Sequence, residues 1–113
     1  MQENLIEFVK ENNISILVVG DTTENLFQIY YGMTKCSSSD LFEQLIEYGS
    51  VSELNESCEG QLMPRIWSQG KMQAILCKPN ENKIVLLFLN SELNVKENYM
   101  RAKELDFKVK TIF

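Results

Sequence analysis

The chain has 113 residues, of which 44% are hydrophobic and 24% charged, and this is the composition of an ordinary soluble globule. It excludes a disordered, collagen-like or membrane-spanning chain, and the length fits a single domain over residues 1–113. The net charge of −5 disfavours direct binding to nucleic acid or to an anionic membrane surface.

The first third of the chain predicts a helix and a β-hairpin. Residues 2–12 place apolar and acidic positions on separate sides at helical spacing, and Asn12 and Asn13 end this amphipathic helix. The apolar run 14–19 predicts a strand that is covered on both faces and therefore lies in the middle of a sheet. Polar turn residues at 21–24 and an alternating segment at 26–31 complete the hairpin.

The middle of the chain predicts a second helix and a second hairpin. Asp40, followed three residues later by Glu43, has the form of a capping box that opens a helix to about Tyr48. Gly49 ends or interrupts this helix, and residues 51–55 can resume a turn. Residues 61–68 and 71–78 predict two strands, and Pro64 assigns the first of them to a sheet edge because proline cannot donate to a ladder.

The last third predicts a central strand, a closing helix and a final strand. The apolar run 83–89 is expected beside the strand 14–19, and residues 92–105 have the charge pairing of a helix. Residues 107–113 alternate again, which predicts an edge strand protected by lysines. The whole pattern predicts an α+β fold of two layers, with a mainly antiparallel sheet of five to six strands packed with three helices.

The residues that usually carry chemistry are absent or badly spaced. The chain has no histidine, the commonest general base and metal ligand. Cys36, Cys58 and Cys77 are odd in number and too far apart for a metal or redox pair, so they are expected to be small buried hydrophobes. We therefore predict no catalytic, cofactor or metal site. The start of the chain has no basic, apolar leader, which predicts a cytoplasmic protein.

Charge is divided unevenly along the chain. Residues 1–60 carry two lysines against eleven acidic residues, and residues 61–113 carry nine basic against five acidic ones. One interpretation is that acidic helices pack beside basic strands, so that the charges cancel within the domain. The other is a surface that attracts a basic protein partner. Its predicted binding residues are two acidic stripes and three aromatic anchors: Glu3, Glu7, Glu11, Asp40, Glu43, Glu47, Tyr30, Tyr31 and Trp67.

In size and acidity the chain resembles the immunity proteins and antitoxins that neutralise basic nuclease toxins. This resemblance implies a non-enzymatic inhibitor that occludes a cationic groove on a toxin.

The order of elements over residues 1–105 also resembles the roadblock or dynein light-chain domain, which implies a homodimer that binds small GTPases. A middle helix rich in glutamate and an extra final strand depart from that family. A third resemblance is to the small, acidic secretion chaperones, which usually have three strands before their middle helix rather than two.

Overall fold

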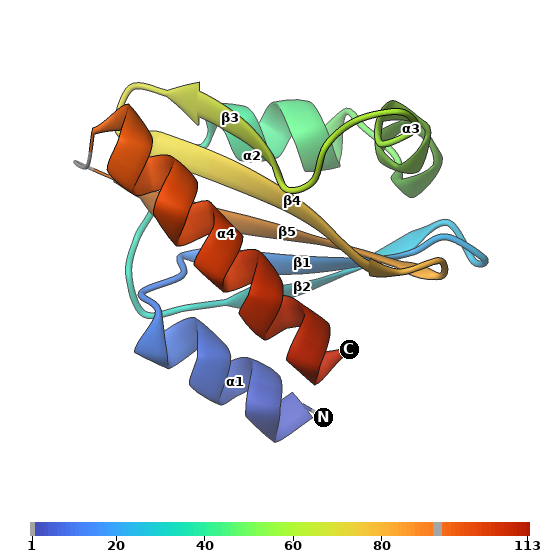
Figure 1. The fold of residues 1–113 in the computed structure, drawn as a ribbon, viewed down its shortest axis with the longest axis horizontal. Coiled ribbons are helices and arrows are strands. Elements are labelled where there is room, and N and C mark those ends of the chain that lie inside the picture. Colours follow the sequence, from blue (N-terminus) through green and yellow to red (C-terminus); the bar gives the residue numbers. More distant parts are fainter. Residues whose placement is uncertain (1, 92–93) are drawn as a thin grey trace.

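The computed structural model describes residues 2–91 and 94–113, and its centre is a five-stranded antiparallel sheet in the order β2-β1-β5-β4-β3. Figure 1 shows the arrangement of the elements in space. The elements in chain order are α1 (Gln2–Glu11), β1 (Ile16–Asp21), β2 (Leu26–Tyr31), α2 (Asp40–Phe42), the π-helical turn η1 (Glu43–Glu47), α3 (Val51–Ser57), β3 (Arg65–Gln69), β4 (Met72–Asn80), β5 (Lys83–Asn90) and α4 (Val95–Ile112).

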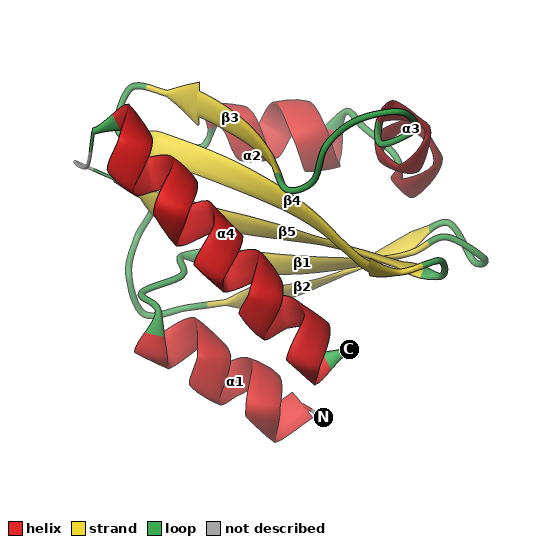
Figure 2. Ribbon diagram, in the orientation of Figure 1, coloured by secondary structure: helices red, strands yellow, loops and turns green. Residues whose placement is uncertain are grey.

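Helices cover both faces of the sheet (Figure 2). The helices α1 and α4 pack on one face through Leu5, Phe8 and Leu105, among others, while α2, η1 and α3 pack on the other. The α+β class and the antiparallel sheet are confirmed, but the molecule has three layers where two were predicted. The physical reason lies in β5, which is buried without interruption from Ile84 to Leu89 and so requires cover on each side.

The two central strands lie where their apolar runs place them. β1 pairs with β5 along its whole length, with Val18 opposite Leu86. Two hairpins then extend the sheet to its edges: β2 pairs with β1, and β3 pairs with β4. Pro64 directly precedes β3, which is an edge strand as predicted.

The end of the chain is helical, so the predicted strand at residues 107–113 is wrong. α4 continues to Ile112, and Ala102, Leu105 and Val109 are buried at helical spacing against the sheet. Phe107, in the same segment, is 69% exposed. The helix begins at Val95, and the amide of Glu97 donates to the side chain of Asn94. The predicted start at residues 92–93 lies outside the described residues.

The middle helix begins at Asp40 but is broken. Ser39, not Asp40, occupies the capping position, and its hydroxyl donates to the Glu43 carboxylate at 3.1 Å. The helix widens into the π-turn η1 and stops before Gly49, where an added Cβ would lie 2.3 Å from the carbonyl oxygen of Leu45. It resumes as α3, which Ser50 caps by accepting the amide of Glu53 at 3.2 Å.

Candidate protein-interaction site

The two predicted acidic stripes lie on opposite faces of the sheet. Glu3, Glu7 and Glu11 are exposed on α1, whereas the second stripe lies on α2 and η1. The carboxylates of that second stripe are Asp40, Glu43 and Glu47. None of the six forms an ion pair with a described residue. The structure therefore does not join them into one acidic surface, and it does not neutralise them with lysines from the second half either.

Among the described residues, few charged side chains of the acidic half contact charged side chains of the basic half. α4 lies beside α1 (Figure 1), and Lys108 reaches across to donate to the side-chain oxygen of Asn12 at 3.2 Å. Its ion pair, at 3.4 Å, is with Glu104 on its own helix. One ion pair does join the halves: Lys83 lies 2.8 Å from Asp21. The hydrogen bond from Lys83 is the largest cause of the lowered pKa of Asp21, and the backbone amides of residues 23 and 24 add to it.

The three predicted aromatic anchors are not neighbours. Trp67 lies on β3 and is half-buried against the core beneath α2, η1 and α3. The Arg65 guanidinium stacks 4.8 Å from its ring centroid and donates to the carbonyl of Ser57 at 3.0 Å, so both side chains are held within the fold. Tyr30 and Tyr31 belong to β2 at the far edge of the sheet and point to opposite faces.

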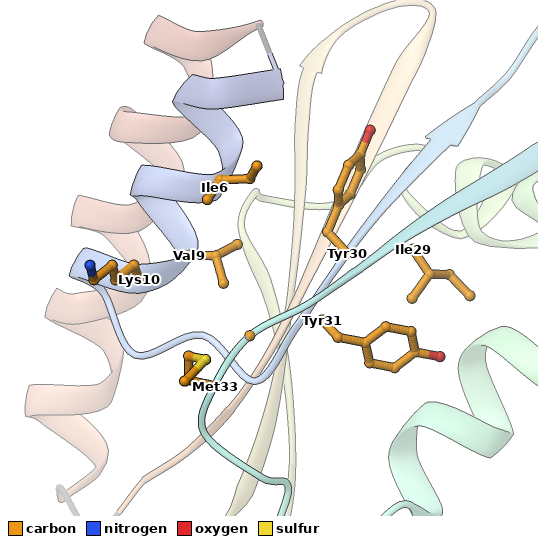
Figure 3. Close-up of a pocket in the computed structure, with 8 residues that line it drawn as sticks. Ile6, Val9, Lys10, Ile29, Tyr30, Tyr31 and Met33 are labelled. Atoms are coloured by element: carbon orange, nitrogen blue, oxygen red, sulfur yellow. The ribbon is translucent and has the colours of Figure 1, made fainter.

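A groove between α1 and β2 is the feature that sequence reasoning missed. It has a volume of about 530 Å³. Figure 3 shows Ile6 and Val9 of α1 on one side and Tyr30 on the other. Ile6 and Met33 are 58% and 95% exposed, so the groove carries an exposed apolar patch. The lining residues are Ile6, Val9, Lys10, Ile29, Tyr30, Tyr31, Gly32 and Met33.

Gly32 sets the distance between the two walls of this groove. A Cβ at this position would lie 2.0 Å from the carbonyl oxygen of Ile14 and 2.9 Å from Cγ1 of Val9. The Gly32 amide donates to the carbonyl of Ser15 at 2.8 Å and so continues the pairing of β2 with β1. Only glycine lets the chain leave β2 this close to α1.

No chemistry is visible at the cysteines. All three thiols are free; Cys58 and Cys77 are buried, as expected, and Cys36 is half-buried. Burial raises the pKa of each thiol, which opposes the thiolate form that a nucleophile or metal ligand requires.

Among the described residues, no three histidine, cysteine, aspartate or glutamate side chains are grouped to hold a metal ion. No described helix combines the length and apolar character needed to cross a membrane.

Comparisons with known proteins find a similar fold but no similar sequence. The arrangement is similar to that of Myxococcus xanthus MglB. The match has a TM-score of 0.59 at 11% sequence identity, and it covers 100% of this chain and 95% of the other. No family model matches the chain. No curated protein matches it by sequence. At this sequence identity, the similarity shows a shared fold.

Proposed function

We propose that this chain is a non-enzymatic protein-binding module of the roadblock type, a small-GTPase adaptor that works as a homodimer. The full-length similarity of its fold to MglB is the observation that carries the proposal. The sheet order β2-β1-β5-β4-β3, with α1 and α4 on one face and the broken middle helix on the other, is the architecture on which this similarity rests. The GTPase and the dimer follow from the roadblock resemblance by analogy of fold.

The acidic-inhibitor hypothesis receives less support. It requires one negative surface that matches a cationic groove, and the two stripes point away from each other on opposite sides of the sheet. The similarity to MglB supports the roadblock-type hypothesis better than the immunity-protein one. We retain the carboxylates of Glu43 and Glu47 as proposed partner-binding residues, since they lie together on the middle helix with no ion-pair partner among the described residues.

The test is nucleotide-dependent binding to a small GTPase. The tagged chain is immobilised, and small GTPases encoded near its gene are passed over it loaded with GDP or with a non-hydrolysable GTP analogue. We expect one of them to bind at least about tenfold more tightly in one nucleotide state than in the other. Equal binding in both states, or none, contradicts the adaptor proposal.

Charge reversal tests the role of the middle helix in the same assay. Glu43→Lys combined with Glu47→Lys is expected to slow association with the GTPase at low salt and to have little effect at high salt, because the Debye length shortens. Glu56→Lys combined with Glu59→Lys, at the end of α3 and in the loop after it, changes the net charge by the same amount and is the matched control. An association rate that responds equally to both changes rules out a local role for these two carboxylates.

A further inference from the structure

We infer that the outer edge of β2 binds an extended, basic segment of a partner protein as a sixth strand of the sheet. This inference goes beyond the proposed function, because it concerns the kind of segment that this edge binds. It does not depend on the activity of the partner. It rests on three observations: the hydrogen-bonding groups of the edge, the groove beside it, and the charges around it.

The backbone of β2 presents alternate residues to its open edge. Gly32 donates to the carbonyl of Ser15, and Thr22 donates to the carbonyl of Asn82 on the β5 side. Directly opposed residues in an antiparallel ladder alternate between hydrogen-bonded and non-bonded pairs. These two bonds therefore show which residues of β1 bond to β2 and which bond to β5. The even-numbered residues of β2 bond to β1. The N–H and C=O groups of Phe27, Ile29 and Tyr31 therefore point outward, where no described strand pairs with them.

This edge lacks the features that normally prevent strand addition. Its sequence, Leu-Phe-Gln-Ile-Tyr-Tyr, contains no charge and no proline. Edge strands in soluble proteins are usually interrupted by lysine, proline or a bulge. β2 pairs with β1 over six consecutive residues without a bulge, so it is regular enough to template another strand.

The groove supplies a place for side chains of the added strand. Tyr30 lies on the α1 side of the sheet, and Ile29 and Tyr31 lie on the other side (Figure 3). A strand added beside β2 would direct every second side chain towards the α1 side. There the cavity of about 530 Å³ between α1 and β2, lined chiefly by apolar side chains, accepts aliphatic or aromatic groups. Main-chain hydrogen bonds and pockets for alternate side chains are the two requirements of strand addition.

The charges around the edge favour a basic occupant. Glu3 is exposed on α1, and Glu24 is exposed in the turn that leads into β2, while Lys10 lines the groove from α1. The hydroxyl and amide of Ser52 both donate to the Asn25 side chain at 3.0 Å, which brings the start of α3, with exposed Glu53, to the same turn. A second copy of the chain would bring two strongly acidic halves together, whereas an extended segment with lysine or arginine would be attracted.

The test uses a designed peptide and the full chain. The probe is acetyl-Arg-Val-Thr-Leu-Thr-Val-Arg-amide with a fluorescent label, and its matched control has glutamate in place of both arginines. We expect the basic peptide to bind at least about tenfold more tightly than the acidic one at low salt, and the difference to shrink as salt is added. Equal binding of the two peptides, or binding of neither, overturns the inference.

Hydrogen exchange locates the binding without any mutation. The amides of Phe27, Ile29 and Tyr31 are expected to exchange rapidly in the free chain and at least about tenfold more slowly with the basic peptide bound. The amides of Gln28 and Tyr30 already bond to β1 and serve as the internal control. Protection of the three outward amides that rises with protein concentration alone, without peptide, shows a second copy at the edge and overturns the basic-segment assignment.

One substitution tests the backbone bonds. Ile29→Pro removes an outward amide that β1 does not use, and we expect it to weaken peptide binding at least about tenfold. Ile29→Val keeps the amide and is expected to keep binding within about twofold. Circular dichroism and the exchange of β1 amides show whether each variant is folded. If the parent chain binds the GTPase but not the basic peptide, this inference fails while the proposed function stands.

Discussion

The two edges of the sheet are built in opposite ways. At the β3 edge, proline precedes the strand, and Arg65 connects Trp67 to the carbonyl of Ser57 at the end of α3. At the β2 edge, six residues without charge run beside an open groove. The comparison teaches that the same fold can hold the side chains of one edge strand against its own helices and leave an apolar groove beside the other. The following predictions test how each edge is held.

The largest effect is expected at the end of β2. Gly32→Ala places a Cβ against the carbonyl oxygen of Ile14, and backbone atoms cannot move aside as a flexible side chain can. We expect the free energy of unfolding to fall by about 3 kcal/mol, measured by urea denaturation.

The control lies in the loop that leads to the other edge. Gly60 has a φ of +70°, and a Cβ added to it would have no atom within 4 Å, so Gly60→Ala carries backbone strain alone. Its expected cost is about 1 kcal/mol. If the two alanine variants are equally stable, close packing at the end of β2 is not what requires glycine there.

An intermediate effect is expected at the β3 edge. Arg65→Ala removes both the cation–π contact with Trp67 and the hydrogen bond to Ser57. The free energy of unfolding should fall by about 1–2 kcal/mol in the same urea measurement. Gln69→Ala, on an exposed residue of the same strand, should change it by less than about 0.5 kcal/mol. Similar losses for the two variants would mean that Arg65 does not hold this edge.

The smallest effect is expected at the turn between β1 and β2. The pKa of Asp21 is lowered in the folded chain, mainly by Lys83, so this group stabilises the fold above its unfolded pKa of about 4. That contribution is lost as the pH falls through the lower folded value. In thermal melts from about pH 6 to about pH 2, Asp21→Asn should be less stable than the parent near neutrality and converge with it in acid. A constant difference at every pH argues against this linkage.

The strand pairing could be predicted because local sequence determined it. Two apolar runs gave the central strands β1 and β5, and turn residues gave both hairpins. The number of layers was wrong even though the run 14–19 indicated a strand covered on both faces. Where each helix packs depends on contacts distant in sequence, such as those of Leu54 with the face opposite α1.

The final helix shows the limit of periodicity. Residues 107–113 alternate as a strand does, but Val109 also continues the helical series of Ala102 and Leu105. Both patterns fit seven residues, and packing against β4 decides between them. The groove could not be found for a related reason: its walls come from α1 and β2, and exposed Ile6 lies beside the buried stripe of its own helix. The one sequence signal for this groove was the absence of charge in residues 26–31. That signal has meaning only once β2 is known to be an edge strand.

The position of Cys36 offers a practical consequence. It is the most accessible of the three thiols, and it lines a hollow with Tyr31 and Gly32 where β2 ends. A maleimide dye added to the unmodified chain should therefore attach there first, without removal of the other two cysteines. The fluorescence of the dye would then change when a peptide binds at the outer edge of β2, so that binding could be followed in real time.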